Sequence, residues 1–422
     1  MSEAIAKSRS EAVLVVGGGI SGITAAVEAA EAGCEVFLVE KGPSLGGRVA
    51  QMNKYFPKLC PPSCGLEINC QRIRKSHPRL RVFTDAEVQS LTGAPGAFEA
   101  TIRIHPRYVN EKCTACGKCV EVCPVQRPNA FNFGMDKTKA VFLPHEMAYP
   151  MRYAIDGEVC RKKECAKCLE ACPYGAIDLD MAAKSLPLRV GAIVAATGWD
   201  PYDAARLDLL GFGRFPNVIT NMMMERLAAP NGPTGGRILR PSDNQPPKRV
   251  VFVQCAGSRD ENHLPYCSAI CCLASFKQAT YVREQIPDSA VRVFYIDRRA
   301  HGTFEEFLAK VEADPGVTAT KGKVAQVEED AATRNLTVMA EDILGGGKLR
   351  AEADLVVLAT GMVPAANHLP LPLKREENGF AADPAQPAGI FVAGLARQPA
   401  DVAAAMQDAT RAAMEAVGFI RG

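Results

Sequence analysis

The chain has 422 residues, of which 47% are hydrophobic, and 49 basic and 47 acidic side chains give a formal net charge of +2. Balanced charges spread along the sequence exclude the basic footprint of a nucleic-acid-binding protein, and no apolar run approaches the ~20 residues of a membrane span. Sixteen closely grouped cysteines after a polar N-terminus, with no visible secretory signal, predict metal clusters in a reducing, intracellular setting rather than disulfides.

The first predicted unit, residues 12–40, reads as strand, glycine turn, helix and second strand. Gly17, Gly19 and Gly22 form G-x-G-x-x-G directly after the apolar run from Val13. Glu40 ends the second strand, where a ribose-binding acid belongs. The complete unit predicts dinucleotide binding, which the glycines alone would support only weakly.

Later segments add to the same site. Gly46 and Gly47 allow another close backbone approach, and Arg48 can reach phosphate. Two strands end in Ala-Thr-Gly, at 196–198 and 359–361, and a last strand stops at Gly394 before a helix that begins near Asp401. These turns resemble the junctions of flavin disulfide-reductase-like proteins, which implies FAD. The predicted cofactor-binding residues are Gly17, Gly19, Ser21, Gly22, Glu40, Lys41, Gly46, Gly47, Arg48, Ala196, Thr197, Gly198, Thr360, Gly361, Gly394, Asp401 and Val402.

Two cysteine runs, each followed by proline, read as an inserted ferredoxin. The first run is C-x2-C-x2-C-x3-C and the second is C-x4-C-x2-C-x3-C. In two-cluster ferredoxins three thiolates come from one run and the fourth from the other. This rule predicts one [4Fe–4S] cluster on Cys113, Cys116, Cys119 and Cys172, and a second on Cys160, Cys165, Cys168 and Cys123. A pair of zinc sites is the less favoured alternative.

A second nucleotide-binding unit begins with the strand at 250–253, but its turn has lost the glycines. "QCAGSRD" contains one glycine, and Cys255, Cys267, Cys271 and Cys272 follow the pattern C-x11-C-x3-C-C. These four thiols are enough to bind a third cluster in place of a pyridine nucleotide. Because Cys271 and Cys272 are adjacent, they cannot easily both face an ordinary cubane, so a noncubane or distorted cluster is an alternative. The alternative is a set of buried free thiols.

Three further cysteines, Cys60, Cys64 and Cys70, follow the Gly47–Arg48 segment. A redox dithiol or a fourth cluster is the specific hypothesis, but C-x3-C is an unusual dithiol spacing and no fourth ligand is identifiable. Structural or partner-facing thiols are the favoured interpretation.

The predicted fold is α/β, with two Rossmann-like nucleotide-fold domains of the FAD disulfide-reductase type and an inserted two-cluster ferredoxin. The expected ranges are 1–105 and 182–241 for the first two parts of the FAD domain, 106–181 for the insert, 242–362 for the degenerate NAD-type domain, and 363–422 for the C-terminal FAD part.

The combination of an FAD domain, a ferredoxin insert and "VVFVQCAGSRD…PYCSAICC" closely resembles the flavoprotein A subunit of heterodisulfide reductase. In that family the four cysteines ligate a [4Fe–4S] cluster beside FAD. The methanogen subunits carry extra ferredoxin-like segments, and without them the chain looks more like the A subunit of the quinone-interacting membrane-bound oxidoreductase of sulfate reducers.

The resemblance implies an electron-transfer flavoprotein subunit that works between a membrane quinone pool and adenylylsulfate reductase. The implied partners are a second subunit with flavin and iron–sulfur clusters, together with a quinone-reactive membrane subunit. The implied location is cytoplasmic and peripheral to the inner membrane. Three alternatives are an NAD(P)H-dependent disulfide reductase, a flavin-based electron-bifurcating subunit and a non-enzymatic iron–sulfur assembly or docking protein. The degenerate second turn argues against NAD(P), and no acid–base pair or nucleophile is predicted.

Overall fold

The computed structural model describes residues 10–300, 302–365 and 369–422, so the polar N-terminal residues, on which the expected absence of a secretory signal rests, lie outside the described ranges. The molecule has two halves, each built on its own parallel sheet. The half that contains the N-terminal strand, the first half, has a five-stranded sheet in which every neighbouring pair of strands is parallel. In sheet order its strands are β22 (Ile390–Val392), β11 (Ala192–Ala195), β1 (Ala12–Val16), β2 (Glu35–Val39) and β3 (Leu80–Phe83). The sheet therefore combines strands from both ends of the chain.

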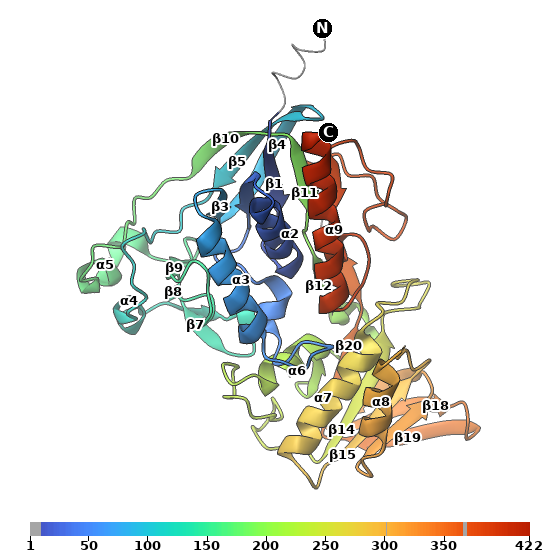
Figure 1. The fold of residues 1–422 in the computed structure, drawn as a ribbon. Helices are drawn as coiled ribbons and strands as arrows, with labels where there is room; N and C mark the ends of the chain where they lie inside the picture. The colour runs from blue at the N-terminus through green and yellow to red at the C-terminus, as the bar shows by residue number, and fades with distance from the viewer. Residues whose placement is uncertain (1–9, 301, 366–368) are drawn as a thin grey trace.

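Both faces of this sheet are covered, which is why its strands are continuous apolar runs. Helices α2 (Ile20–Glu31), α3 (Pro62–Ser76) and α9 (Val402–Arg421) pack on one face, α2 and α9 through alanine-rich surfaces (Figure 1). On the other face lies an antiparallel sheet of β4 (Ala86–Ala94), β5 (Ala97–Ile104) and β10 (Lys184–Val190). Small alanine side chains allow the helices to approach the strands closely.

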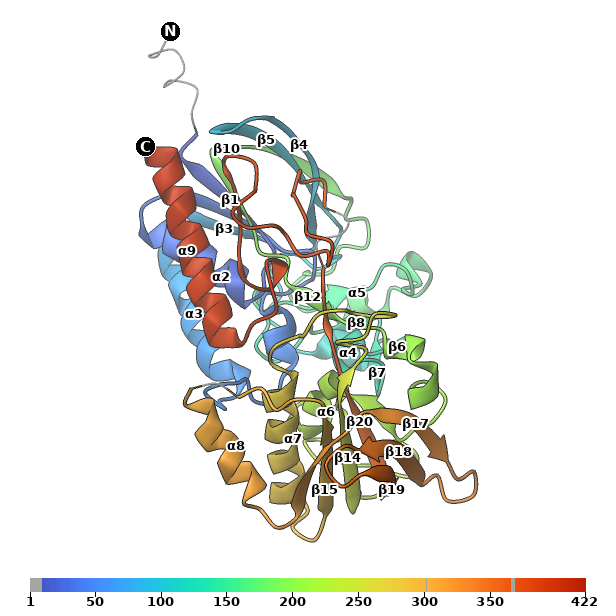
Figure 2. The same ribbon diagram turned by 90° about the vertical axis from the view of Figure 1, so that its right-hand side faces the viewer.

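The second half repeats this architecture (Figure 2). Its parallel sheet has the order β13 (Val218–Thr220), β20 (Leu355–Thr360), β14 (Arg249–Ala256), β15 (Ala290–Tyr295) and β16 (Val317–Lys321). Helices α6 (Asn221–Ala228), α7 (Cys271–Gln285) and α8 (Phe304–Glu312) cover one face, and the antiparallel strands β17 (Val324–Glu329), β18 (Leu336–Asp342) and β19 (Gly347–Ala353) cover the other. Segment 182–241 thus contributes strands to both parallel sheets.

The two halves are joined at the Ala-Thr-Gly turns, residues 196–198 and 359–361. Directly after these turns, β12 (Trp199–Pro201) pairs antiparallel with β21 (Met362–Pro364).

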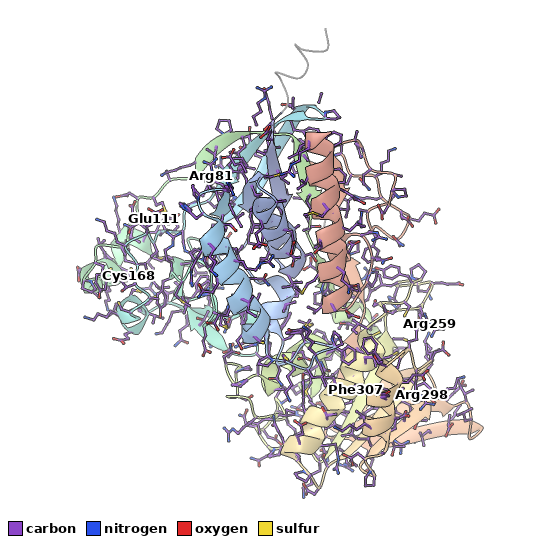
Figure 3. All side chains as sticks on the ribbon, viewed as in Figure 1. Arg81, Glu111, Cys168, Arg259, Arg298 and Phe307 are labelled. Atoms are coloured by element: carbon purple, nitrogen blue, oxygen red, sulfur yellow. The ribbon has the colours of Figure 1, made fainter. Side chains whose placement is uncertain are left out.

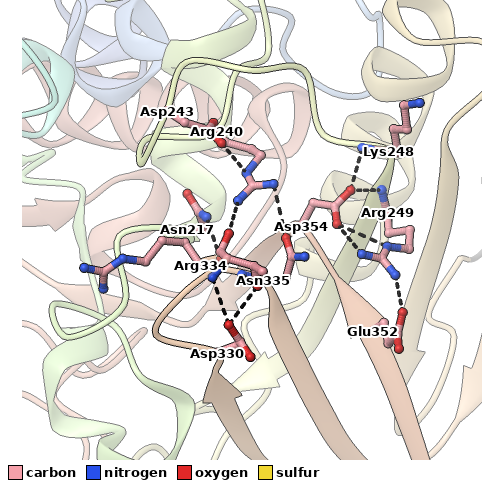
Figure 4. A network of polar contacts seen from close by, with 11 residues as sticks. Asn217, Arg240, Asp243, Lys248, Arg249, Asp330, Arg334, Asn335, Glu352 and Asp354 are labelled. Atoms are coloured by element: carbon pink, nitrogen blue, oxygen red, sulfur yellow. Dashed lines mark hydrogen bonds and ion pairs between the residues drawn. The ribbon is translucent and has the colours of Figure 1, made fainter.

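A polar network connects the segment before β14 to the start of β20 in the second sheet. Asp354 accepts hydrogen bonds from the backbone N–H groups of Lys248 and Arg249 at 2.9 and 3.0 Å (Figure 4).

The cysteine-rich insert extends from the side of the first half, with α4 (Lys118–Glu121) and α5 (Lys167–Ala171) at its tip (Figure 1). It also contains the short hairpins β6 (Gln126–Pro128) with β7 (Lys137–Lys139), and β8 (Val141–Phe142) with β9 (Ala154–Ile155). Its small core consists of cysteines together with residues such as Tyr108, Val109 and Ile177.

Short 3-10 helices complete the chain at Gly47–Gln51, Ala130–Asn132, Lys162–Glu164, Ala204–Arg206, Asp208–Leu210 and Gly394–Ala396. Within the described ranges, none of the helices combines the length and the apolar character that crossing a bilayer requires.

Candidate functional site

A cavity of about 590 Å³ lies at the carboxyl ends of β1, β2 and β11, where doubly wound folds bind their ligands. Its volume is in the range of cofactor pockets, which run from about 300 to 1,000 Å³. The opposite wall comes from α6 and α7 of the second half. The cavity is therefore shared between the two parallel-sheet units.

Thirteen of the seventeen predicted cofactor-binding residues line this cavity: Gly17, Gly19, Ser21, Glu40, Lys41, Gly47, Arg48, Ala196, Thr197, Gly198, Thr360, Asp401 and Val402. The other four, Gly22, Gly46, Gly361 and Gly394, do not line it. A Cβ atom on Gly394 would come within 2.0 Å of Ser21 Oγ, so this glycine allows close packing rather than ligand contact.

The glycine turn is shaped to receive a phosphate. Gly17 has φ +108°, and a Cβ on Gly22 would lie 1.7 Å from the Gly17 carbonyl oxygen, so neither position accepts a side chain. Gly19 is the N-cap of α2 and supplies no side-chain cap. The N–H groups of the first turn of α2 are therefore available to an anionic group in the cavity.

Glu40 is held at the end of β2 by two turns. Its carboxylate accepts hydrogen bonds from the N–H groups of Gly18 at 2.5 Å and Gly42 at 2.6 Å. Burial raises the pKa of this carboxyl, and the two N–H donors oppose that rise. The arrangement places an acceptor where ribose hydroxyls are bound in this fold.

Polar atoms in the wall are left without partners in the chain. Thr197 Oγ1 and Gln278 Oε1 are buried and make no hydrogen bond, although buried polar atoms are nearly always paired. The N-terminus of α9, capped by Asp401 through the N–H of Ala404 at 2.9 Å, also faces the cavity. A ligand with several donors and acceptors, such as a flavin, would satisfy these groups.

A buried polar cluster in the second-half wall was not predicted. Lys277 and Glu225 are 3% and 2% exposed, and Lys277 Nζ lies 2.9 Å from Glu225 Oε1. Gln278 donates to the same oxygen at 2.6 Å, and Lys277 also donates to the Lys54 carbonyl at 2.5 Å. A lysine and a glutamine next to the buried Phe276 and Ala279 of α7 were the signal that could have revealed this cluster.

The four thiols of the second unit come together at the edge of this cavity. Cys255 is the penultimate residue of β14 and has φ +55°, and Cys271 and Cys272 are the first two residues of α7. Burial, together with Cys272 and Cys267, raises the pKa of the Cys255 thiol to about 11. Cys271 lines the cavity itself, whereas Cys272 Sγ points to the Asp297 carbonyl at 3.3 Å. Cys271 thus lies between the other thiols and the flavin-sized space.

The loop that carries these thiols occupies the place of a dinucleotide turn. Asp297, just beyond β15 where a ribose acid would be, forms an ion pair with Arg259 at 2.7 Å. The second Ala-Thr-Gly turn supports the loop, since a Cβ on Gly361 would lie 2.4 Å from Ser258 Oγ. The Met362 N–H also donates to Ser268 Oγ at 2.9 Å.

The thiols of the insert fall into two groups. Cys113, Cys116, Cys119 and Cys172, one of the predicted ligand sets, line a single small cavity. Burial and the neighbouring Cys160 and Cys123 raise the pKa of Cys168 to about 11, so members of the second set are also close to one another. Cys168 lies on the insert, far from Arg259 beside the third thiol group (Figure 3).

No three described His, Cys, Asp or Glu side chains surround a point in the geometry of a single metal ion. A four-iron cluster instead places its thiolates around a cube, and the grouped cysteines have the donor chemistry for it. The ligand sets remain predictions.

Cys60, Cys64 and Cys70 line neither the large cavity nor the small cavity of the insert. Cys64 is exposed, while Cys60 and Cys70 are half-buried. Burial and the neighbouring Cys60 and Cys64 raise the pKa of Tyr55, which places these two thiols near its ring. Cys70 lies farther along α3, where burial raises its pKa.

Family models match two parts of the chain. The model for FAD dependent oxidoreductases matches residues 12–60, and that for the 4Fe-4S binding domain matches residues 106–126. The chain is similar over 98% of its length to the thioredoxin reductases of T. acidophilum and Lactococcus lactis, each with a TM-score of 0.53, at 14% and 12% identity and with 100% and 99% of those chains covered. At these identities the likeness shows the fold alone, and it confirms the predicted fold class.

Curated relatives match nearly the whole chain. The A subunit of the H2:CoB-CoM heterodisulfide, ferredoxin reductase from Methanothermobacter marburgensis is 39% identical over 100% of the chain and 66% of its own length. The iron-sulfur A subunit of the CoB–CoM heterodisulfide reductase from Methanocaldococcus jannaschii is 40% identical over 92% of the chain and 61% of its own length. The chain therefore spans less than two thirds of these relatives.

Proposed function

Because the chain is a homologue of the heterodisulfide reductase A subunits, we propose that it is the FAD and iron–sulfur electron-transfer subunit of a multi-subunit oxidoreductase. The observation that carries the proposal is the position of Cys271, which borders a flavin-sized cavity together with the glycine turn at Gly17 and Gly19. A flavin and a thiolate-bound cluster would thus be neighbours.

The residues of the chain supply binding and electrostatics, while the cofactors supply the redox chemistry. Bound FAD would exchange one or two electrons. The first turn of α2 would bind its pyrophosphate, Glu40 its ribose, and the N-terminus of α9 would face the isoalloxazine ring. Lys277 would place its ammonium group, paired with Glu225, in the wall beside the flavin.

Electrons would pass one at a time between the flavin and the Cys255/Cys267/Cys271/Cys272 centre. The insert, with Cys113, Cys116, Cys119 and Cys172 around one cluster and Cys160, Cys165, Cys168 and Cys123 around the other, would then deliver them to a further subunit. α4 and α5 lie at the tip of the insert, away from both sheets, which suits contact with a partner.

We further propose that the complex connects a membrane quinone pool to adenylylsulfate reductase, with this subunit held at the inner membrane by its partners. The relatives named for heterodisulfide reduction and ferredoxin support the alternative, a flavin-based electron-bifurcating subunit, more directly. The two differ in whether reduction of a low-potential ferredoxin accompanies the reaction.

The pair of Arg259 and Asp297 supports the absence of an NAD(P) site, because the acid that would hold a ribose is already engaged. An NAD(P)H-dependent reductase predicts that NADH or NADPH bleaches the flavin. The present proposal predicts that neither does so.

The decisive measurement is FAD and iron content after anaerobic purification. Three four-iron clusters predict about twelve irons per flavin. About eight irons would remove the third cluster, and a colourless protein without flavin would overturn the proposal.

A further inference from the structure

Arg226 is the largest side chain that the core encloses completely, with 0% exposure. It belongs to α6, on the second half of the molecule, and the proposed chemistry does not use it. Burying a guanidinium is unfavourable unless all of its donors are paired. The partners of Arg226 therefore indicate what its burial achieves.

These partners come from three parts of the chain. Arg226 Nε donates to Asn132 Oδ1 of the insert at 2.8 Å, and Nη1 donates to the Gln51 carbonyl, beside the flavin-binding turn, at 3.2 Å. Nη2 donates to Asn231 on its own half, at 2.7 Å to Oδ1. The guanidinium also lies over the ring of Phe131, 4.7 Å from its centroid. One side chain thus contacts the insert and both halves.

The surrounding groups fix this arrangement. Burial lowers the pKa of Arg226 to about 10, and the nearby Asp136, Glu225 and Glu146 oppose that change, so the guanidinium is charged at neutral pH. Asp136 Oδ2 accepts a hydrogen bond from Asn132 Nδ2 at 2.9 Å, which turns Asn132 Oδ1 toward Arg226.

A short chain of contacts leads from Arg226 to the cofactor cavity. Gln51 Nε2 donates to the Phe131 carbonyl at 3.1 Å, and Arg48 Nη1 donates to Gln51 Oε1 at 3.1 Å. Arg48 and Gln51 both line the cavity. The segment Phe131–Asn132 of the insert is therefore fastened to residues that would touch the flavin.

The insert also contacts the segment just before Gly46 and Gly47. His145 stacks on Phe131 with ring centroids 5.4 Å apart, and its Nε2 lies 3.1 Å from Ser44 Oγ. The Leu45 N–H donates to the Tyr149 carbonyl at 3.0 Å. Both contacts fix the insert against residues that adjoin Gly46 and Gly47.

We propose that Arg226 is a positioning residue that holds the ferredoxin insert at a set separation from the flavin site. This inference rests on the proposed function, in which one electron leaves the reduced flavin and reduces one oxidised cluster. Transfer over a fixed gap depends steeply on geometry, so releasing the insert lowers its rate even when every cofactor remains bound.

The test replaces Arg226 with methionine, which keeps the apolar length of the side chain and removes its donors. In partly reduced protein, the magnetic coupling between the singly reduced flavin and the reduced clusters is measured by electron paramagnetic resonance. The flavin-to-cluster rate is measured after a one-electron pulse. We expect weaker coupling, a rate lowered by about tenfold, faster hydrogen exchange at residues 129–136, and partial recovery in Arg226→Lys.

Arg240→Met is the matched control, since Arg240 donates to Asn335 Oδ1 and the Thr333 carbonyl within the second half and does not reach the insert. It should leave coupling and rate unchanged. Wild-type coupling, rate and exchange in a fully loaded Arg226→Met protein would overturn the inference.

If Arg226→Met loses its cofactors, the same measurements on Asn132→Ala test the inference, because this variant removes the acceptor for Arg226 Nε. Weaker coupling supports the inference, and unchanged coupling overturns it. Wild-type protein without flavin or iron would instead remove the proposed function, so the two failures are distinguishable.

Discussion

Gly22 shows how one missing Cβ allows close packing beside the proposed flavin site. A methyl group there would lie 1.7 Å from the Gly17 carbonyl oxygen and force α2 away from β1. We expect Gly22→Ala to destabilise the protein by about 1–3 kcal/mol and to lower its FAD content, as measured by urea unfolding and flavin absorbance.

Gly418→Ala is the matched control for this substitution. Gly418 lies within α9, and nothing comes within 4 Å of the position of its Cβ. An alanine there should stabilise by about 0.5–1 kcal/mol because it lowers the entropy of the unfolded chain. Equal FAD content in both variants would contradict the packing role of Gly22.

Lys277 is expected to tune the flavin rather than to hold it. Lys277 balances the charge of Glu225 in the cavity wall. Lys277→Met would leave that negative charge unbalanced and should lower the flavin reduction potential by roughly 60 mV, a tenfold change for one electron. Anaerobic redox titration measures the shift. Lys310→Met, on the exposed face of α8, is the control, and an unchanged potential in Lys277→Met would contradict an electrostatic role.

At the scale of elements, Asp354 joins the start of β14 to the start of β20. Burial raises the pKa of this carboxyl, but hydrogen bonds from Arg249 and the backbone outweigh burial, so the net pKa is lowered. Its contribution to stability is therefore present above the unfolded pKa of about 3.9 and is lost as the pH falls through the lower folded value.

Asp354→Asn should thus destabilise the second half by about 1–3 kcal/mol at pH 7 and by less at low pH. Chemical denaturation at several pH values measures this difference. Asp288→Asn, at an exposed position, should have no such effect. A loss of stability that did not depend on pH would argue against the ionised carboxylate as its source.

The two cysteine runs are expected to exchange one ligand each. Cys172→Ser should therefore eliminate the same cluster as Cys113→Ser, although the two residues belong to different runs. Cys160→Ser should eliminate the other cluster. Iron content and the electron paramagnetic resonance of each reduced variant check this, and a shared signature of Cys172→Ser with Cys160→Ser would contradict the exchange.

At the scale of the whole molecule, the sequence predicted those features whose residues lie close together along the chain. The glycine turn with Glu40, the Ala-Thr-Gly turns and the helix after Asp401 were readable because each places several informative residues within one short segment. The paired sheets and their insert followed from the order of these segments. The likeness to thioredoxin reductases confirms the flavoprotein fold, and the 4Fe-4S domain match at residues 106–126 confirms a ferredoxin domain.

What the sequence did not reveal depends on tertiary approach. Lys277 meets Glu225 from another helix, and Arg226 meets Asn132 and Gln51 from three separate segments. No spacing rule connects such positions, and a buried lysine or arginine looks like a surface residue until its partners are known.

The position of β22 and α9 has a consequence for biosynthesis. The sheet that begins with β1 receives its edge strand and a large covering helix only from residues 390–421, so synthesis must proceed beyond these residues before that core can close. The insert is fully translated long before then. Iron delivery to the insert of the nascent chain can therefore precede closure of the flavin cavity.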